Sequence, residues 1–224
     1  MSLTLAPPRT EVLPKNIIRL RPPASQVTAP ASVPSPPSPP SLAELVAAGS
    51  PMRVKMSREQ WLDYPFEGKS EWVDGEAVLM LPARHDHSYA QGGLQAELSV
   101  AFPGLRASPE YWVSTSRGTR VPDVALVPRG TGKAERDVRP LLVAEILSRS
   151  SARQDREAKA AEYLNAGIGQ YWIVDPVAET VEVLRNDGGV RWQRIAVVDS
   201  RHPEAAIEVA GHGTAVIRHS EIFE

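Results

Sequence analysis

Apolar residues are grouped along the chain in runs that are typical of buried strands. Residues 141–147 and 171–174 form two such runs, and a polar segment at 151–165 lies between them. The polar segment is predicted to be a helix, because Gly167 follows it as a suitable left-handed C-cap. A strand, a helix and a strand in this order predict one right-handed crossover between parallel strands.

Other parts of the pattern predict antiparallel pairs. Residues 71–73 and 76–80 form two short runs, and Asp74-Gly75 between them supplies the positive φ angles of a type I′ turn, so a hairpin is predicted. Residues 181–184 and 190–198 are predicted to form a second hairpin through a turn rich in Asn, Asp and Gly. Further strands are expected at 111–114 and 120–128.

Two helices are expected before the central strands. Ser57 with Gln60 has the spacing of a capping box, and residues 87–102 carry apolar positions at helical intervals before Pro103-Gly104 stops the pattern. The order of elements predicts an α/β fold with a central mixed β-sheet flanked by helices.

Composition divides the chain at about residue 50. Residues 1–50 hold eleven of the 21 prolines, so we predict a disordered Pro-rich leader there and one folded domain at 51–224. The chain has no cysteine, which excludes disulfides and thiolate chemistry. No apolar run is long enough for a membrane span and no signal-peptide pattern is present, so a cytoplasmic protein without membrane contact is expected.

The candidate chemistry is carried by two carboxylates on the apolar strands. Asp123 lies near the start of 121–127 and Glu145 lies inside 141–147, where an isolated charge is costly unless it is paired or bound to a cation. If the strands are neighbours, both carboxylates can bind one divalent cation. Oxygen ligands favour Mg²⁺ or Mn²⁺, and the absence of cysteine argues against zinc.

A lysine on the following helix completes the candidate site. Asp155, Lys159 and Tyr163 are spaced by four residues, so Lys159 could reach back over the end of the Glu145 strand to offset phosphate charge. The alternative interpretation is an exposed ion pair between Asp155 and Lys159, with Tyr163 at the edge of the core.

Several motifs occur together in the order of a known nuclease family. They are Glu71-Trp72-Val73-Asp74-Gly75-Glu76, a helix that opens at His87, Pro122-Asp123-Val124, Val143-Ala144-Glu145-Ile146-Leu147-Ser148, Asp155-x-x-x-Lys159-x-x-x-Tyr163, Ala166-Gly167 and Tyr171-Trp172-Ile173-Val174-Asp175-Pro176. With this set the chain resembles the Uma-two family, a branch of the PD-(D/E)XK nuclease superfamily, from about residue 55 to residue 224.

The resemblance implies a restriction-endonuclease-like fold and metal-dependent cleavage of phosphodiester bonds. It implies Asp123 and Glu145 as metal ligands and Lys159 as the third catalytic residue, displaced to the helix because Leu147 occupies the position at which the superfamily has its lysine. The superfamily's substrate class makes DNA the expected substrate.

Further residues are carried over as supporting candidates. Glu71 could make an outer-sphere metal contact or be solvated, and His87 could face the cleft or serve as a surface or capping residue. Gln91, one turn after His87, is a candidate for contact with DNA or water, and Asp155 is a candidate for positioning Lys159.

Two functions remain open from the sequence. The first is a Mg²⁺- or Mn²⁺-dependent endonuclease, in which a homodimer would provide two sites for double-strand cleavage. The second is a catalytically silent module of the nuclease fold that binds nucleic acid or a protein partner. A net charge of −2, without a basic stripe, argues mildly for the second function.

Overall fold

The computed structural model describes residues 35–48, 51–130, 138–148 and 155–224, with Asp155 and Arg156 described by their backbone alone. Most of the predicted leader at 1–50 is therefore outside the described residues, and its disorder stays a prediction. The last part of that segment forms a short helix, α1 (Leu42–Ala48), and Leu45 of this helix is buried.

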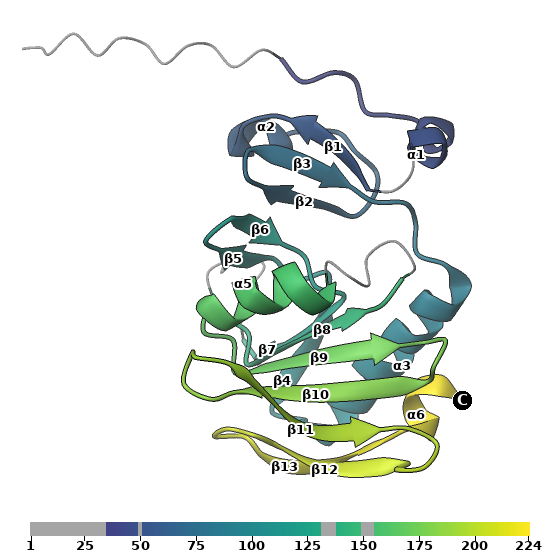
Figure 1. Ribbon diagram of the computed structural model, residues 1–224, viewed down its shortest axis with the longest axis vertical. Helices are drawn as coiled ribbons and strands as arrows, with labels where there is room; N and C mark the ends of the chain where they lie inside the picture. The colour runs from purple at the N-terminus through teal and green to yellow at the C-terminus, as the bar shows by residue number, and fades with distance from the viewer. Residues whose placement is uncertain (1–34, 49–50, 131–137, 149–154) are drawn as a thin grey trace, which may run out of the picture. The chain divides into compact units, whose positions relative to one another are not determined.

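A six-stranded mixed sheet positions most of the candidate residues (Figure 1). Its order is β11 (Trp192–Val198), β10 (Thr180–Asn186), β9 (Gln170–Asp175), β8 (Leu142–Ile146), β7 (Val124–Pro128) and β4 (Leu105–Pro109). Strands β8 and β9 are parallel, as the strand–helix–strand pattern predicts, and the other pairs of this sheet are antiparallel.

A second, five-stranded sheet contributes the hairpin that carries Glu71. Its order is β1 (Met52–Lys55), β3 (Glu76–Leu79), β2 (Ser70–Val73), β6 (Gly118–Arg120) and β5 (Val113–Thr115). Asp74 and Gly75 have φ angles of 52° and 82°, which confirms the predicted turn between β2 and β3. Gly118 lets β6 approach β2, because a Cβ atom there would lie 2.0 Å from the carbonyl oxygen of Trp72.

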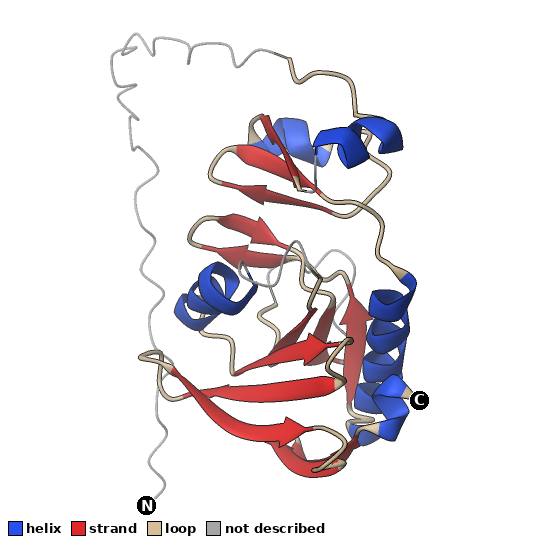
Figure 2. Cartoon of the chain, turned by 45° about the vertical axis from the view of Figure 1, so that its right-hand side comes forward, coloured by secondary structure: helices blue, strands red, loops and turns tan. Residues whose placement is uncertain are grey.

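Helices cover both faces of the six-stranded sheet (Figure 2). Helix α3 (His85–Ala101) packs Leu94 and Leu98 against one face, in a cluster that includes Leu126 and Ala144. Helix α5 (Ala160–Asn165), which continues a π-helical turn η1 (Asp155–Lys159), packs Tyr163 against the other face. Alternate residues of β8 belong to the two clusters, as expected for a strand buried on both sides. The fold is the predicted α/β arrangement, a mixed sheet flanked by helices.

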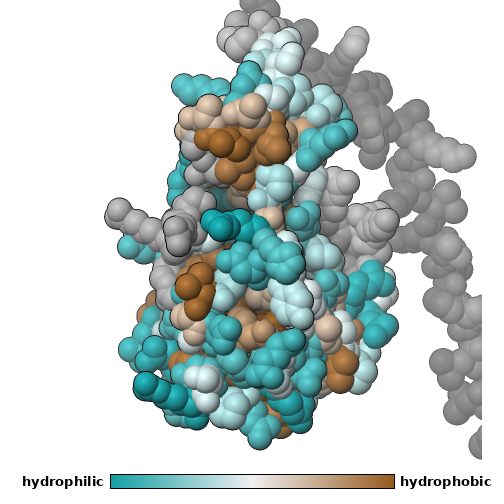
Figure 3. All heavy atoms as spheres, turned by 90° about the vertical axis from the view of Figure 1, so that its right-hand side faces the viewer, coloured by the Kyte–Doolittle hydropathy of each residue, from teal (hydrophilic) through white to brown (hydrophobic). Residues whose placement is uncertain are grey.

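The remaining elements are helix α2 near the start of the domain and a hairpin followed by a short helix at its end. Helix α2 (Arg58–Leu62) begins with the predicted capping box of Ser57 and Gln60, and the chain ends with the hairpin β12 (Glu204–Val209) and β13 (Gly213–Arg218) and helix α6 (Ser220–Phe223). The face in Figure 3 is mostly hydrophilic, with hydrophobic residues gathered in its upper part. None of the helices in the described ranges is long and apolar enough to cross a membrane.

The expected strand at 120–128 is wrong, because two strands of different sheets share this segment. Strand β6 ends at Arg120 and β7 begins at Val124, so residues 121–123 form the connection between the sheets. Pro122 has no N–H group for a strand ladder, and the Val121 N–H donates to the Glu71 carboxylate, with 3.1 Å between nitrogen and oxygen. Asp123 is consequently the residue immediately before β7 and is not part of the strand.

Candidate active site

The two predicted carboxylates lie on neighbouring strands. Val124 of β7 pairs with Ala144 of β8, so Asp123 and Glu145 stand side by side one residue beyond this pair. The Ile146 N–H donates to Oδ2 of Asp123 over 2.7 Å and ties the start of β7 to β8. Both carboxylates are buried, with 3% of Asp123 and 1% of Glu145 exposed.

Asp123 is surrounded by cationic and polar groups from two other elements. Lys69 is the residue just before β2, and its Nζ atom is 2.5 Å from Oδ1 of Asp123. Nε2 of His87, on α3, is 3.3 Å from Oδ2 of Asp123. Burial opposes the charge of Asp123, but Lys69 and His87 outweigh it, so the pKa of Asp123 is well below its ordinary value. Burial also opposes the charge of Lys69, yet the carboxylates of Asp123 and Glu145 raise its pKa. Asp123 and Lys69 are therefore both charged at neutral pH.

Glu145 is held by two residues of the η1–α5 segment. Nζ of Lys159 lies 3.0 Å from one carboxylate oxygen of Glu145, and the Tyr163 hydroxyl donates to the other over 2.7 Å. Burial and the neighbouring carboxylates of Glu145 and Glu71 raise the pKa of Tyr163 well above its ordinary value. The Tyr163 hydroxyl therefore remains a neutral hydrogen-bond donor that fixes the orientation of Glu145.

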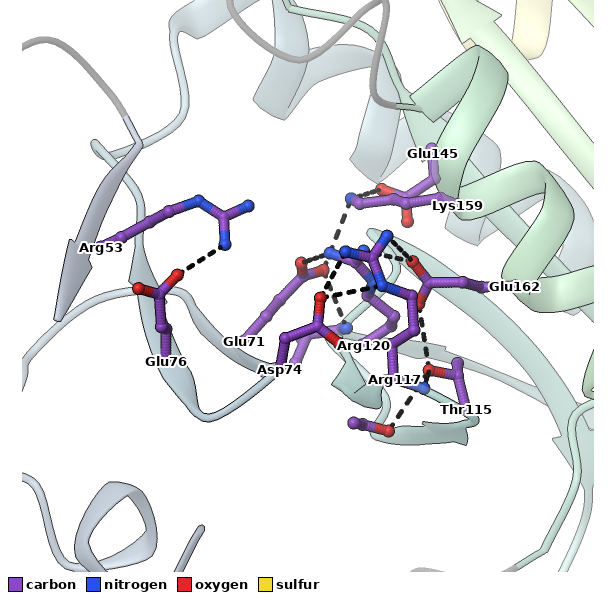
Figure 4. A network of polar contacts seen from close by, with 12 residues as sticks. Arg53, Glu71, Asp74, Glu76, Thr115, Arg117, Arg120, Glu145, Lys159 and Glu162 are labelled. Atoms are coloured by element: carbon purple, nitrogen blue, oxygen red, sulfur yellow. Dashed lines mark hydrogen bonds and ion pairs between the residues drawn. The ribbon is translucent and has the colours of Figure 1, made fainter. Parts of the chain in front are cut away.

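Glu71 joins this pair to a buried arginine (Figure 4). Its carboxylate lies 3.4 Å from Nζ of Lys159 and accepts a hydrogen bond of 2.7 Å from Arg120. Arg120 also binds Glu162 of α5 through two nitrogens, at 2.5 and 2.8 Å. Burial disfavours both charges, but the pairing is stronger, so the pKa of Glu71 is lowered and that of Arg120 is raised.

An outer layer closes the arginine side of the cluster. Arg117 lies 3.4 Å from Glu162 and also pairs with Asp74 in the β2–β3 turn, and the Thr115 hydroxyl donates to Glu162 over 3.0 Å. Glu162 is 3% exposed, whereas the side chain of Arg117 is 44% exposed. The cluster therefore reaches the surface at Arg117 and is buried around Arg120.

The net formal charge of the cluster is negative, which is compatible with binding of a divalent cation. Four buried carboxylates, Glu71, Asp123, Glu145 and Glu162, face the three cations Lys69, Arg120 and Lys159, so the formal sum is −4 + 3 = −1. Within the described ranges no three His, Asp or Glu side chains are grouped as ligands of one metal ion. Magnesium is commonly held by one or two carboxylates, with waters and substrate phosphates completing its shell. The oxygens of Asp123 and Glu145 fit such a site.

The structure brings together most of the residues expected from the sequence. Lys159 is 3% exposed and contacts Glu145 and Glu71, so its interpretation as an exposed surface lysine is wrong. Glu71 is 0% exposed, so it is not a solvated residue, and the His87 side chain faces Asp123 with 14% of its surface exposed. The Gln91 side chain donates to the Asp123 carbonyl oxygen over 2.8 Å, which gives it a partner other than DNA or water. The side chain of Asp155 is outside the described part of the chain.

Apart from the outer layer, three charged residues of the cluster, Lys69, Glu162 and Arg120, were not expected from the sequence. Lys69 stands two residues before Glu71, and this strand spacing places both on one face, a signal that could have found it. Glu162 follows Lys159 by three residues, which is compatible with a shared helix face. Arg120 gives no such local signal, because its partners are 42 and 49 residues away in the chain.

Comparison with known proteins identifies a related fold and a family. A crystal structure of a protein described as a putative nuclease from Anabaena variabilis matches with a TM-score of 0.58 and 20% sequence identity, over 75% of this chain and 97% of that chain. At this identity the match shows the fold. No curated protein matches the chain. The family model Uma2, described as "Putative restriction endonuclease", matches residues 58–213, and the chain therefore belongs to the Uma2 (Uma-two) family.

Proposed function

We propose that the chain is a metal-dependent endonuclease that hydrolyses phosphodiester bonds of DNA, with Mg²⁺ or Mn²⁺ as its cofactor. The observation that carries this proposal is the placement of Asp123 and Glu145 side by side on β7 and β8, with Lys159 3.0 Å from Glu145. Two carboxylates can hold a divalent cation, and a lysine can offset the charge of a phosphate.

Asp123 and Glu145 are the proposed metal ligands. When bound, the cation would polarise a phosphate oxygen and lower the pKa of a water molecule. The chain orients the two ligands before the cation arrives, because Ile146 and Tyr163 donate hydrogen bonds to Asp123 and Glu145. Such preorganisation reduces the ordering that binding must accomplish.

Lysine side chains supply the positive charge that would act on the phosphate. The ammonium of Lys159, between Glu145 and Glu71, is the proposed group that orients the attacking water and offsets phosphate charge. Lys69 and His87 are more accessible, with 16% and 14% of their side chains exposed, and they border Asp123. They are suited to contact the phosphate as it approaches Asp123.

DNA is proposed as the substrate because of the family's description as a restriction endonuclease. Each chain has one proposed active site, so cleavage of both DNA strands requires either two successive binding events or a dimer with two sites. A homodimer is the simpler arrangement. Local cations rather than the net charge of −2 would then attract the phosphates.

A silent binding module is the second candidate, and one observation favours it. Each carboxylate oxygen of the two proposed ligands already has a protein partner: Lys69 and Ile146 for Asp123, and Tyr163 and Lys159 for Glu145. A cluster that is satisfied in this way can be stable without any metal.

A manganese titration combined with a nuclease assay separates the two candidates. Calorimetry should show manganese binding by the wild type and a large loss of affinity in Asp123→Asn, while Asp187→Asn, in the β10–β11 turn, should bind as the wild type does. Single-stranded and double-stranded DNA and RNA are then incubated with manganese or with a chelator. Absence of both manganese binding and metal-dependent cleavage would overturn the proposed function in favour of the silent module.

A further inference from the structure

A pocket with aromatic walls lies beside the candidate active site. It has a volume of about 220 Å³ and is lined by residues that include Trp61, Tyr64, Phe66, Lys69 and Trp112. The rings of Trp61 and Trp112 are 4.7 Å apart and inclined by 34°. We call this space the aromatic pocket. None of the aromatic residues in it takes part in the proposed hydrolysis.

Lys69 connects the aromatic pocket to the proposed metal ligands. Its side chain lines the pocket, while its Nζ atom is 2.5 Å from Oδ1 of Asp123. A phosphate that contacts Lys69 is therefore close to Asp123 and to the pocket that Lys69 lines.

Tyr64 lines the pocket and carries a hydrogen-bonding group without a described partner. The hydroxyl of Tyr64 is buried and has no hydrogen-bond partner among the residues that the structure describes. Burial raises the pKa of Tyr64, so this hydroxyl is a neutral donor and acceptor. A buried polar group without a partner carries a desolvation cost, and a ligand with a polar edge can relieve it once the Tyr64 side chain shifts toward the pocket.

We propose that the aromatic pocket binds a single unstacked nucleobase of a DNA strand whose phosphate contacts Lys69. This inference rests on the proposed function, because it assumes that a nucleic acid backbone reaches Asp123. A nucleobase has two features that suit the pocket: flat faces that stack on aromatic rings and a polar edge that can bond to the Tyr64 hydroxyl after a shift of that side chain.

The size of the pocket selects one base rather than a base pair. A volume of 220 Å³ equals about seven water molecules at ~30 Å³ each, which suits one planar ring system. The substrate is therefore a strand with an unpaired nucleotide: single-stranded DNA, a frayed end or a mismatched position. A fully paired duplex should bind more weakly than the same duplex with one mismatch, because its base must first be unpaired and unstacked.

The test compares two single-stranded DNA oligonucleotides of equal length, one with all its bases and one with abasic central positions. Their affinity for the full chain is measured by fluorescence anisotropy in a chelator, so that no cleavage is needed. The wild type should bind the abasic strand about tenfold more weakly, a difference of about 1.4 kcal/mol. Trp112→Leu should bind the complete strand about tenfold more weakly and lose the preference between the two strands.

A second variant keeps the proposal testable if Trp112→Leu folds poorly. Tyr64→Phe retains the ring and removes a hydroxyl that has no partner, so its thermal unfolding midpoint should not fall. It should nevertheless bind the complete strand about threefold more weakly. The matched control is Tyr89→Leu, an exposed ring on α3 whose hydroxyl donates to the Glu224 carbonyl, and it should leave both affinities unchanged.

The outcomes distinguish this inference from the proposed function. Equal affinity of the wild type for both strands, no measurable binding of either strand, or an unchanged base preference in Trp112→Leu would overturn the base pocket. Cleavage of the complete strand by the wild type with manganese is measured in parallel. Base-dependent binding without any such cleavage would support the pocket and overturn the proposed hydrolysis.

Discussion

The buried polar cluster has two halves that use different cations. In the arginine half, Arg120 holds Glu71 and Glu162 in a fixed fork, and Arg120 is 1% exposed. In the lysine half, Lys69 and Lys159 bind Asp123 and Glu145, and the Lys69 side chain is 16% exposed. A guanidinium stays charged and keeps its geometry, whereas an ammonium is a compact charge that can shift between oxygens. The comparison indicates that the arginine half supports the fold and the lysine half is suited to chemistry.

Lys159→Ala should have the largest effect, on the rate of cleavage. We expect a loss of about 10²–10⁴-fold with manganese, because the variant lacks the group that orients water and offsets phosphate charge. Manganese affinity should be largely retained, because the proposed ligands Asp123 and Glu145 remain. Rates are measured well below the unfolding midpoint of the variant, since the loss leaves Glu145 and Glu71 without this cation. Full manganese-dependent cleavage by the variant would remove Lys159 from the catalytic set.

Arg120→Met should have the largest effect on stability. The free energy of unfolding should fall by about 3–5 kcal/mol, because Glu71 and Glu162 lose a buried partner. Urea denaturation measures the loss, and the double variant with Glu162→Gln should recover part of it by removing one of the unpaired charges. A loss below ~1 kcal/mol would show that the arginine half is not the structural one.

Asp123→Asn should lower the free energy of unfolding at neutral pH by about 1.5–3 kcal/mol, because Lys69 loses a charged hydrogen-bond partner. The pKa of Asp123 is lowered in the folded protein, so its contribution is present above the ordinary Asp pKa of about 3.9 and is lost as pH falls toward the folded value. The wild type should therefore lose its advantage over the variant below about pH 4.

Urea denaturation at a series of pH values checks this prediction. Repulsion between the Asp123 and Glu145 carboxylates acts in the opposite direction. If the variant is more stable than the wild type at neutral pH, repulsion outweighs the pairing with Lys69, and the two halves differ less than we infer.

Arg53→Ala provides the smallest effect and the reference for the others. Its side chain pairs with Glu76 over 3.1 Å, but it is 42% exposed. The free energy of unfolding should change by less than ~1 kcal/mol, and the change should shrink as salt is added. A loss as large as that of Arg120→Met would mean that burial is not what separates these ion pairs.

Features encoded by neighbouring residues could be predicted from the sequence. Asp74-Gly75 specified a hairpin turn, and the two apolar runs specified the parallel pair β8–β9 with a helix between them. Asp123 and Glu145 were recognisable because each carries a charge in or beside an apolar segment, and Lys159 was found from its spacing on the following helix and from the family resemblance. These inferences needed only the local environment of each residue.

Features that depend on distant parts of the chain could not be predicted in this way. The segment 120–128 has the composition of one strand, and its division between two sheets depends on where Glu71 and α5 lie. Arg120 finds Glu162 across 42 residues, so no spacing rule connects them. Strand and helix patterns indicate which side chains share a face, but they do not indicate which faces meet.

The long separations within the arginine half have a consequence for the order of folding during synthesis. A growing chain contains Glu71 and Arg120 well before Glu162, which follows Arg120 by 42 residues. Until α5 has been made, the Arg120 fork has only one of its two buried carboxylates and cannot be enclosed without cost. Packing of the two sheets around the cluster must therefore be a late step of folding. Fragments that end before α5 should not bury Arg120 and should be susceptible to proteases.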